Sequence, residues 1–320
     1  MNQAQAIENN CIKKEISKRN RSDFRRIAKK RWLYAMLIPG LLYFLVFKYL
    51  PMWGLLIGFQ DYSPFLGFFR SQWVGLANFQ KFFSNGDFVL LLRNTLYLAL
   101  LNIVIYFPLP IIVALLLNEV RKDRFKKIIQ TLVYIPHFFS WVIIVGLTFI
   151  FLNVDDGLIN NIIKSTGGEP ISFLLNPALF RPLITLQVIW KECGWGTIIF
   201  LAALSSVDVS LYEAAVVDGA SRWKQLWHIT LPAIRSTIII LLILRLGAFL
   251  DTGFEQLILM VTPLTREVGE VFDTYVYTNG IQQGNFSYTT AVGLFKSVIG
   301  LILIFASNKL ATKFGEEGIF

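Results

Sequence analysis

Six long apolar stretches constrain the fold of this chain more than any other feature. Each contains roughly the twenty apolar residues that a helix needs to cross the hydrocarbon core of a bilayer. Prolines and glycines inside them are compatible with bundled membrane helices, because neighbouring helices can satisfy the freed backbone groups. Barrel strands would instead alternate over about ten residues. The sequence therefore predicts an all-α integral membrane protein with six transmembrane helices, at approximately 33–59, 89–117, 128–152, 183–204, 233–260 and 289–310.

The composition indicates that part of the chain's surface contacts lipid rather than water. Of the 320 residues, 55% are hydrophobic and 16% are charged, whereas a soluble domain carries about a quarter charged residues. Two cysteines, Cys11 and Cys193, provide no disulfide framework. The first apolar run begins near Trp32 and has no small-residue cleavage site behind it, so we expect a retained helix rather than a cleaved signal peptide.

Basic residues predict which side of the membrane each loop occupies. The formal net charge is +9, and Lys and Arg crowd the segment before the first apolar run and the loop "NEVRKDRFKK". By the positive-inside rule, both termini are expected in the cytoplasm. The sequence then divides into a basic cytoplasmic tail (1–32) able to form an interfacial helix, a transmembrane domain (33–310) and a cytoplasmic C-terminal tail (311–320). Nucleic-acid binding is not expected, because no recognition motif accompanies these charges.

A charged and aromatic segment, "YEAAVVDGASRWKQLWHITLPAI", lies between the fourth and fifth apolar stretches. Ser210 and Glu213 fit a capping box at the start of a short helix, and Gly219 can supply the left-handed residue that ends it. Ser221 can cap a second helix of roughly ten residues, which Pro232 would terminate. Helices this short are not stable alone, so we expect the pair to pack against a partner.

This segment resembles the EAA loop of binding-protein-dependent ABC importer permeases. Stretches such as "YLPMWGLLIGFQDYSP", "LLRNTLYLALLNIV" and "ALLLNEVRKDRFKKIIQTLVYIPHFFSWV" extend the resemblance over almost the whole chain, to the carbohydrate branch that imports alginate, aldouronate and pectin-derived oligosaccharides. It implies a methionine-permease-like fold in which the loop 210–232 is a coupling helix that docks on the ATP-hydrolysing subunit. Glu213 alone fits a plain capping role equally well. The residues expected to couple are Glu213, Ala214, Ala215, Asp218, Gly219, Ala220, Trp227, Ile229, Leu231 and Pro232.

The same resemblance implies the partners of the chain: a second homologous permease, two ABC ATPase subunits and an extracellular solute-binding protein. The sequence lacks a Gly-x-x-x-x-Gly-Lys-Ser/Thr phosphate loop, so we expect ATP and Mg on the ATPase subunits and no cofactor here. The two histidines, His137 and His228, form no zinc motif, and no catalytic motif is present. We therefore expect neither a metal site nor an enzyme, and a packing or interfacial role for His137.

Polar residues inside apolar stretches are costly and are candidates for a substrate path. A sugar path needs hydrogen-bonding groups together with aromatic plates, and a cationic Lys191 or Arg245 would suit a uronate carboxylate. The alternative is that these charges pair between helices, for example Lys191 or Arg245 with Asp251. Lys48 and Lys296 are expected to snorkel toward the span ends. The candidates are Gln187, Lys191, Glu192, Trp195, Arg245, Asp251, Asn102 and Tyr106.

Together these features predict a multi-pass subunit of a bacterial cell membrane. It would move oligosaccharides, expected to contain uronic acid, from an extracellular binding protein into the cytoplasm by ATP-driven alternating access. The rival hypothesis is a secondary transporter or channel that works without ATP. That rival accounts for the spans and the intramembrane charges but leaves the short helix pair without a role.

Overall fold

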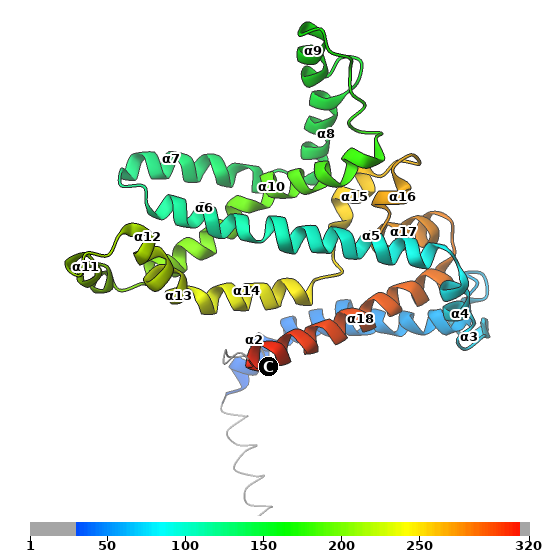
Figure 1. Ribbon diagram of the computed structural model, residues 1–320. Coiled ribbons are helices and arrows are strands. Elements are labelled where there is room, and N and C mark those ends of the chain that lie inside the picture. Colours follow the sequence, from blue (N-terminus) through cyan, green and yellow to red (C-terminus); the bar gives the residue numbers. More distant parts are fainter. Residues whose placement is uncertain (1–29, 314–320) are drawn as a thin grey trace, which may run out of the picture. The chain divides into compact units, whose positions relative to one another are not determined.

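The computed structural model describes residues 30–313 (Figure 1). The expected basic tail falls almost wholly, and the expected C-terminal tail mostly, outside the described residues, as does Cys11. The chain divides into two compact units, Met1–Leu56 and Ile57–Phe320. The first unit contains α2 (Arg31–Phe44), which continues through one π-helical turn, η1 (Leu45–Tyr49), into the 3-10 helix η2 (Leu50–Phe59), whose last three residues belong to the second unit. The side chains of residues 35–52 are all exposed within the chain, which fits contact with lipid or another subunit.

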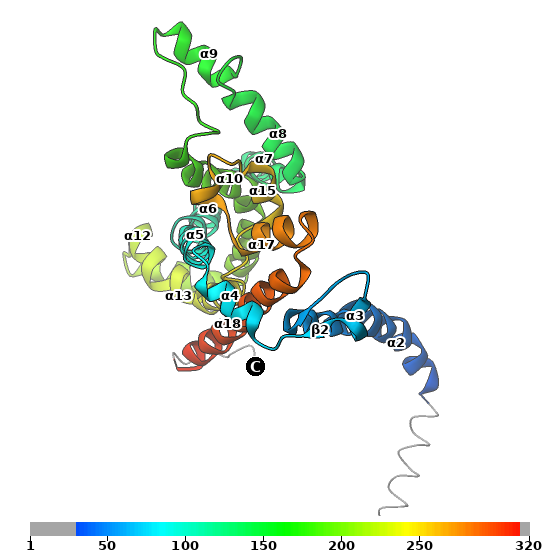
Figure 2. The ribbon, with the colours of Figure 1, turned by 90° about the vertical axis from the view of Figure 1, so that its right-hand side faces the viewer.

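The second unit begins with a short hairpin of β1 (Gln60–Asp61) and β2 (Gln72–Trp73), which pair antiparallel around α3 (Gly67–Arg70). Helices form nearly all the rest of this unit (Figures 1 and 2). Its first half contains α4 (Ala77–Ser84), α5 (Asp87–Leu101), η3 (Asn102–Tyr106), α6 (Pro108–Asn118), α7 (Asp123–Tyr134), η4 (Ile135–Phe138), α8 (Trp141–Leu152) and α9 (Leu158–Ser165).

The second half is organised around α10 (Pro177–Ser205), which contacts both α5 and α6. After it come α11 (Val209–Val217), α12 (Arg222–Gln225), η5 (Leu226–Thr230), α13 (Leu231–Ala233), α14 (Arg235–Gly247), α15 (Phe254–Met260), α16 (Arg266–Gly269), α17 (Phe272–Tyr275), η6 (Val276–Gln282) and α18 (Phe286–Lys313).

Four helices of the described part are long and apolar enough to cross a membrane, or up to six if each of two bent pairs counts as one span. The bent pairs are Asp123–Phe138 with Trp141–Leu152, and Arg222–Ala233 with Arg235–Gly247. The four continuous spans match the first, second, fourth and sixth predicted stretches. They are Ala35–Phe59, Asp87–Asn118, Pro177–Ser205 and Phe286–Lys309. The third and fifth stretches were predicted wrongly as continuous helices.

The third stretch, 128–152, is bent by 101° between Phe138 and Trp141. Pro136 lies in the 3-10 turn that closes the first half, and the Ser140 hydroxyl accepts the Ile143 N–H, so that a new helix begins at Trp141. The fifth stretch, 233–260, is interrupted after Gly247. Residues 248–253 are not helical, and Gly253 adopts a φ of 89°, a conformation that favours glycine. Apolar length alone does not reveal either break.

Within residues 30–313, three of the four π-helical turns end two residues before a proline. They are η1 before Pro51, η3 before Pro108 and η5 before Pro232. A proline lacks the N–H of the normal ladder, and its ring clashes with the carbonyl four residues earlier. A wider turn relieves this clash without ending the helix. The prolines therefore shape these helices rather than terminate them.

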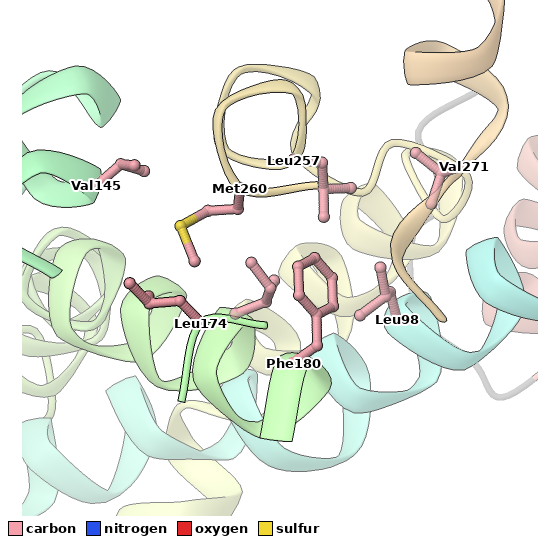
Figure 3. Packing of buried hydrophobic residues seen from close by; sticks show 8 residues of the cluster. Leu98, Val145, Leu174, Phe180, Leu257, Met260 and Val271 are labelled. Atoms are coloured by element: carbon pink, nitrogen blue, oxygen red, sulfur yellow. The ribbon is translucent and has the colours of Figure 1, made fainter. Parts of the chain in front are cut away.

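A buried apolar cluster joins the interrupted fifth stretch to the rest of the unit (Figure 3). Leu257 and Met260 of α15 meet Leu98 of α5, Val145 of α8 and Phe180 of α10. Residues from distant parts of the sequence thus converge on one core, which holds α15 in place after the break.

Candidate functional site

The first short helix of the pair, α11, begins two residues earlier than the capping-box prediction requires. Its N-cap is Asp208, whose carboxylate accepts the Ser210 N–H at 2.9 Å. This backbone hydrogen bond also lowers the pKa of Asp208. The prediction that Ser210 caps the helix was wrong, because the helix begins at Val209 and Ser210 lies inside its first turn, with its own N–H bound to Asp208. The Glu213 side chain is exposed and is not the partner of the Ser210 amide.

The turn between the two helices is as predicted. Gly219 adopts a φ of 72°, its N–H donates to Val216 O at 3.0 Å, and the Ala220 N–H donates to Ala215 O at 2.8 Å. These two bonds form a Schellman motif. Ser221 caps the second helix by accepting the Lys224 N–H. That helix continues past Pro232 to Ala233, where a bend of 58° leads into α14.

Side-chain contacts fix the pair as one structure and join it to α6. The Tyr212 and Thr230 hydroxyls lie 3.0 Å apart across the two helices. The Arg222 guanidinium donates to the Glu119 carboxylate at the end of α6. Directly after α13, Ile234 is buried against Phe200 and other apolar residues of α6 and α10. Movement of the pair would therefore be transmitted to the long helices.

The outward face of the pair is apolar and uncovered within the chain. Trp223 and Trp227 are 69% and 56% exposed, and Val217 is 87% exposed. A hollow of about 570 Å³ opens beside Trp223, lined by Leu116 and Leu226 among others. Exposed apolar surface of this kind marks an interaction site. Of the predicted coupling residues, Glu213, Ala214, Asp218, Gly219, Trp227 and Pro232 are exposed, and Ala215, Ala220, Ile229 and Leu231 are half-buried.

A second group of polar residues surrounds the middle of α10. The Lys191 ammonium is buried and donates to the carbonyls of His137 and Phe139, both at 2.7 Å. The Glu192 carboxylate lies 2.9 Å from His137 Nδ1, and the His137 ring stacks on Trp195 with centroids 4.6 Å apart. The expected packing role of His137 is confirmed. We call His137, Lys191, Glu192 and Trp195, with Tyr106 and Arg245, the central cluster.

Tyr106 and Arg245 bring two more elements to this cluster. The Tyr106 hydroxyl donates to the Glu192 carbonyl at 3.3 Å, and the Arg245 guanidinium lies 5.6 Å from the centroid of the Tyr106 ring. Among the described residues, no carboxylate lies within ion-pair distance of Arg245. Lys191 and Arg245 thus contribute two positive charges against one from Glu192, so the central cluster has a cationic surplus.

The other predicted path residues have contacts outside the central cluster or none with it among the described hydrogen bonds. Gln187 is buried and hydrogen-bonds Thr148 and Gln256, both at 2.7 Å. Asn102 is half-buried on the π-helical turn η3. Asp251 pairs with Lys296 at 2.6 Å, so the alternative prediction that it pairs with Lys191 or Arg245 was wrong.

Lys296 was also predicted wrongly as a snorkelling residue. Its ammonium contacts Asp251 and both oxygens of Asp273, at 2.7 and 2.8 Å. These three residues border a hollow of about 460 Å³ between α14 and α18, which we call the inner hollow. Sequence reasoning missed Asp273, because it lies 23 residues from Lys296 in a segment assigned to an outer loop. The sequence feature that indicates this site is Lys296 itself, because it is a charged residue inside the apolar stretch 289–310.

Comparisons with known proteins give a consistent result. Residues 106–315 match the family model of the binding-protein-dependent transport system inner membrane component. The chain is 62% identical to Protein LplB of Bacillus subtilis (strain 168), over 92% of each chain. It is 58% identical to the polygalacturonan/rhamnogalacturonan transport system permease protein YteP of the same organism, over 99% of this chain and 98% of YteP.

A solved structure shares the fold. It is a chain of the bacterial alginate ABC transporter in complex with an alginate pentasaccharide-bound periplasmic protein. The two chains superpose with a TM-score of 0.86 at 39% sequence identity, covering 92% of this chain and 99% of that one.

Proposed function

The chain belongs to the family of binding-protein-dependent transport system inner membrane components, and we propose that the ABC importer of which it is a permease subunit takes up acidic oligosaccharides of the pectin type. As a permease subunit it is a transport component and not an enzyme. The observation that carries the choice of cargo is the near-full-length identity of 58% with a polygalacturonan/rhamnogalacturonan permease. The cationic surplus of the central cluster is compatible with a galacturonate carboxylate.

The proposed assembly contains a second permease, two ATPase subunits and an extracellular solute-binding protein. ATP and Mg would be held by the ATPase subunits, because this sequence contains no phosphate loop. The exposed face of α11 to α13, with Trp223 and Trp227, would dock on an ATPase subunit. That face is apolar and is coupled to the long helices through Arg222 and Ile234, as a mechanical link requires.

The proposed topology has six spans, of which the third and fifth are broken, and both termini in the cytoplasm. Counting each broken stretch as one crossing places the loop after α6 and the pair α11 to α13 on the same side as both termini. The basic residues of those loops support this orientation. The transmembrane domain would then cover 33–310, with the coupling loop at 210–232 and short cytoplasmic tails at 1–32 and 311–320.

We propose that transport proceeds by alternating access. Closure of the ATPase pair on ATP would pull the helix pair, and α10 and α14 would follow because Ile234 is packed against Phe200. The break at 248–253 separates α14 from α15, so α14 can tilt while the core around Leu257 stays in place. Sugar released from the binding protein would then pass the central cluster and the inner hollow.

Uptake by the reconstituted complex in vesicles tests the cargo and the role of Arg245. With binding protein saturated by an oligogalacturonide, an Arg245→Gln variant should transport roughly tenfold more slowly, the loss expected when one charge-assisted hydrogen bond is removed. Transport of a neutral arabino-oligosaccharide, if the complex accepts it, should not change, and Arg245→Lys should recover part of the loss. Equal rates for Arg245→Gln and the unaltered complex would exclude contact between Arg245 and the carboxylate.

A further inference from the structure

A second polar hollow, of about 340 Å³, lies in the segment between α15 and α18. We call it the outer hollow. Its polar lining includes Thr262, Arg266, Glu270, Thr274, Thr278 and Asn279. It is separate from the inner hollow, because α17 and η6 form a wall between the two: Asp273 and Val276 line the inner hollow, whereas Thr274 and Thr278 line the outer one.

The outer hollow is lined by residues of α15 to α17 and η6, and α15 to α17 lie at the opposite end of α10 from the helix pair (Figure 1). The Arg181 guanidinium, near the start of α10, donates to Val268 O at 3.1 Å, in α16 beside the hollow. The helix pair follows the other end of α10, beyond Ser205. A helix of 29 residues is about 44 Å long at 1.5 Å per residue. In the proposed topology, the outer hollow therefore faces the extracellular side, where sugar arrives.

Hydrogen bonds and ion pairs hold this hollow in shape without a ligand. Arg266 binds the Glu270 carboxylate, whose side chain is only 7% exposed. The Asn94 side chain donates to Glu270 O at 3.0 Å. The Thr262 N–H donates to the Thr265 hydroxyl at 2.9 Å. A site fixed in advance by such contacts loses little conformational freedom on binding.

The chemistry of the lining suits hydroxyl groups better than anions. Arg266 has carboxylates on both sides, Glu270 and Asp87, the latter at 3.7 Å, so the guanidinium charge is already compensated. The Asn279 amide donates to Tyr275 O at 3.1 Å, and its side-chain oxygen remains available as an acceptor. Thr278 adds a hydroxyl that can donate and accept. Mixed donors and acceptors of this kind match the hydroxyl edges of a sugar.

We propose that the outer hollow is a receiving subsite that binds the hydroxyl edges of trailing units of a long oligosaccharide, occupied while the leading units lie deeper in the path. This inference rests on the proposed function. A short sugar cannot fill the outer hollow and the deeper path at once, whereas a long one can. The subsite would therefore favour long substrates over short ones.

The test compares chain lengths in the complete reconstituted complex. The variant combines Thr278→Val with Asn279→Leu, which keeps side-chain size and removes the hydrogen-bonding groups. Thr166→Val, directly after α9, is the matched control. ATP hydrolysis is measured with binding protein saturated by a galacturonate disaccharide or hexasaccharide. We expect a several-fold loss of stimulation by the hexasaccharide-loaded protein and none by the disaccharide-loaded protein, with the control unchanged.

Two results would overturn the subsite. Equal losses for both sugars would mean that the variant disturbs docking of the binding protein or the fold, and unchanged stimulation for both would mean that no sugar contacts the hollow. An unaltered complex that neither sugar stimulates would instead refute the proposed function on which the subsite rests. A normal disaccharide response in the variant also shows that the altered complex is folded.

Discussion

Two cations of the central cluster have different surroundings, although the sequence offers them as equivalent candidates. Lys191 is buried, and its ammonium satisfies two backbone carbonyls at the end of η4. Arg245 is half-buried over the Tyr106 ring and has no ion-pair partner among the described carboxylates. The Lys191 ammonium is therefore used to hold the backbone at the end of η4, whereas the Arg245 guanidinium remains able to bind an anion.

Thermal unfolding of the purified complex should separate these two roles. Lys191→Met removes the charged donor from two carbonyls, so we expect a loss of about 1–3 kcal/mol of stability and a lower midpoint temperature. Arg245→Met removes only a cation–π contact, worth about 0.5–1 kcal/mol. A midpoint that falls equally in both variants would contradict the structural role of Lys191.

Gly194 allows α10 to approach α7 closely. A Cβ atom at this position would lie 2.1 Å from Val133 O, a backbone atom that cannot move independently. Gly194→Ala should therefore displace one helix and reduce the yield of folded complex several-fold, measured by size-exclusion chromatography. Gly146→Ala is the control, because a Cβ there meets nothing within 4 Å. Normal yield for Gly194→Ala would show that the two helices can separate at little cost.

The helix pair depends on the left-handed turn more than on any side chain at that position. A Cβ atom at Gly219 would meet nothing within 4 Å, so substitutions there act through the backbone conformation alone. Asn tolerates φ values near 72° better than Ala does. Proline cannot adopt them and also lacks the N–H that binds Val216 O.

ATP hydrolysis stimulated by the sugar-loaded binding protein should fall in the same order, from Asn through Ala to Pro at position 219, in which these residues tolerate the left-handed conformation. Gly219→Asn should retain most of the stimulation, Gly219→Ala should lose part of it, at a strain of about 1–2 kcal/mol, and Gly219→Pro should lose nearly all. Basal hydrolysis by the ATPase subunits serves as the internal control. Full stimulation in the proline variant would show that the turn has no part in coupling.

At the scale of whole helices, apolar length predicts the four continuous spans, because a bilayer imposes a minimum run of apolar residues. The two breaks could not be predicted in this way, since residues 248–253 include the apolar side chains of Phe249 and Leu250. Turn chemistry was more informative: Gly219 and Ser221 lie where their conformational preferences indicated. Ser210 does not cap α11 because Asp208 occupies the N-cap position, so that Ser210 lies inside the first turn and its N–H is bound by Asp208.

At the scale of the molecule, the contacts of Lys296 show that the spacing of residues along one helix does not predict ion pairs between distant segments. Its partners lie 45 and 23 residues away, at distances that no helical repeat predicts. The polar groups extend along the chain's long helices, from the outer hollow near the start of α10 to the helix pair beyond its end. This arrangement agrees with the proposed function, in which sugar enters near the outer hollow and the ATPase subunit acts on the helix pair.

The central claim is that movement of a separate ATPase, delivered through the helix pair, drives sugar across the membrane. Uptake of a labelled oligogalacturonide into vesicles tests it most directly, using the complete complex with ATP, the same complex without ATP, and this chain alone. The account predicts uptake only by the complete complex with ATP. Uptake by this chain alone, or by the complex without nucleotide, would contradict it and favour the ATP-independent carrier or channel.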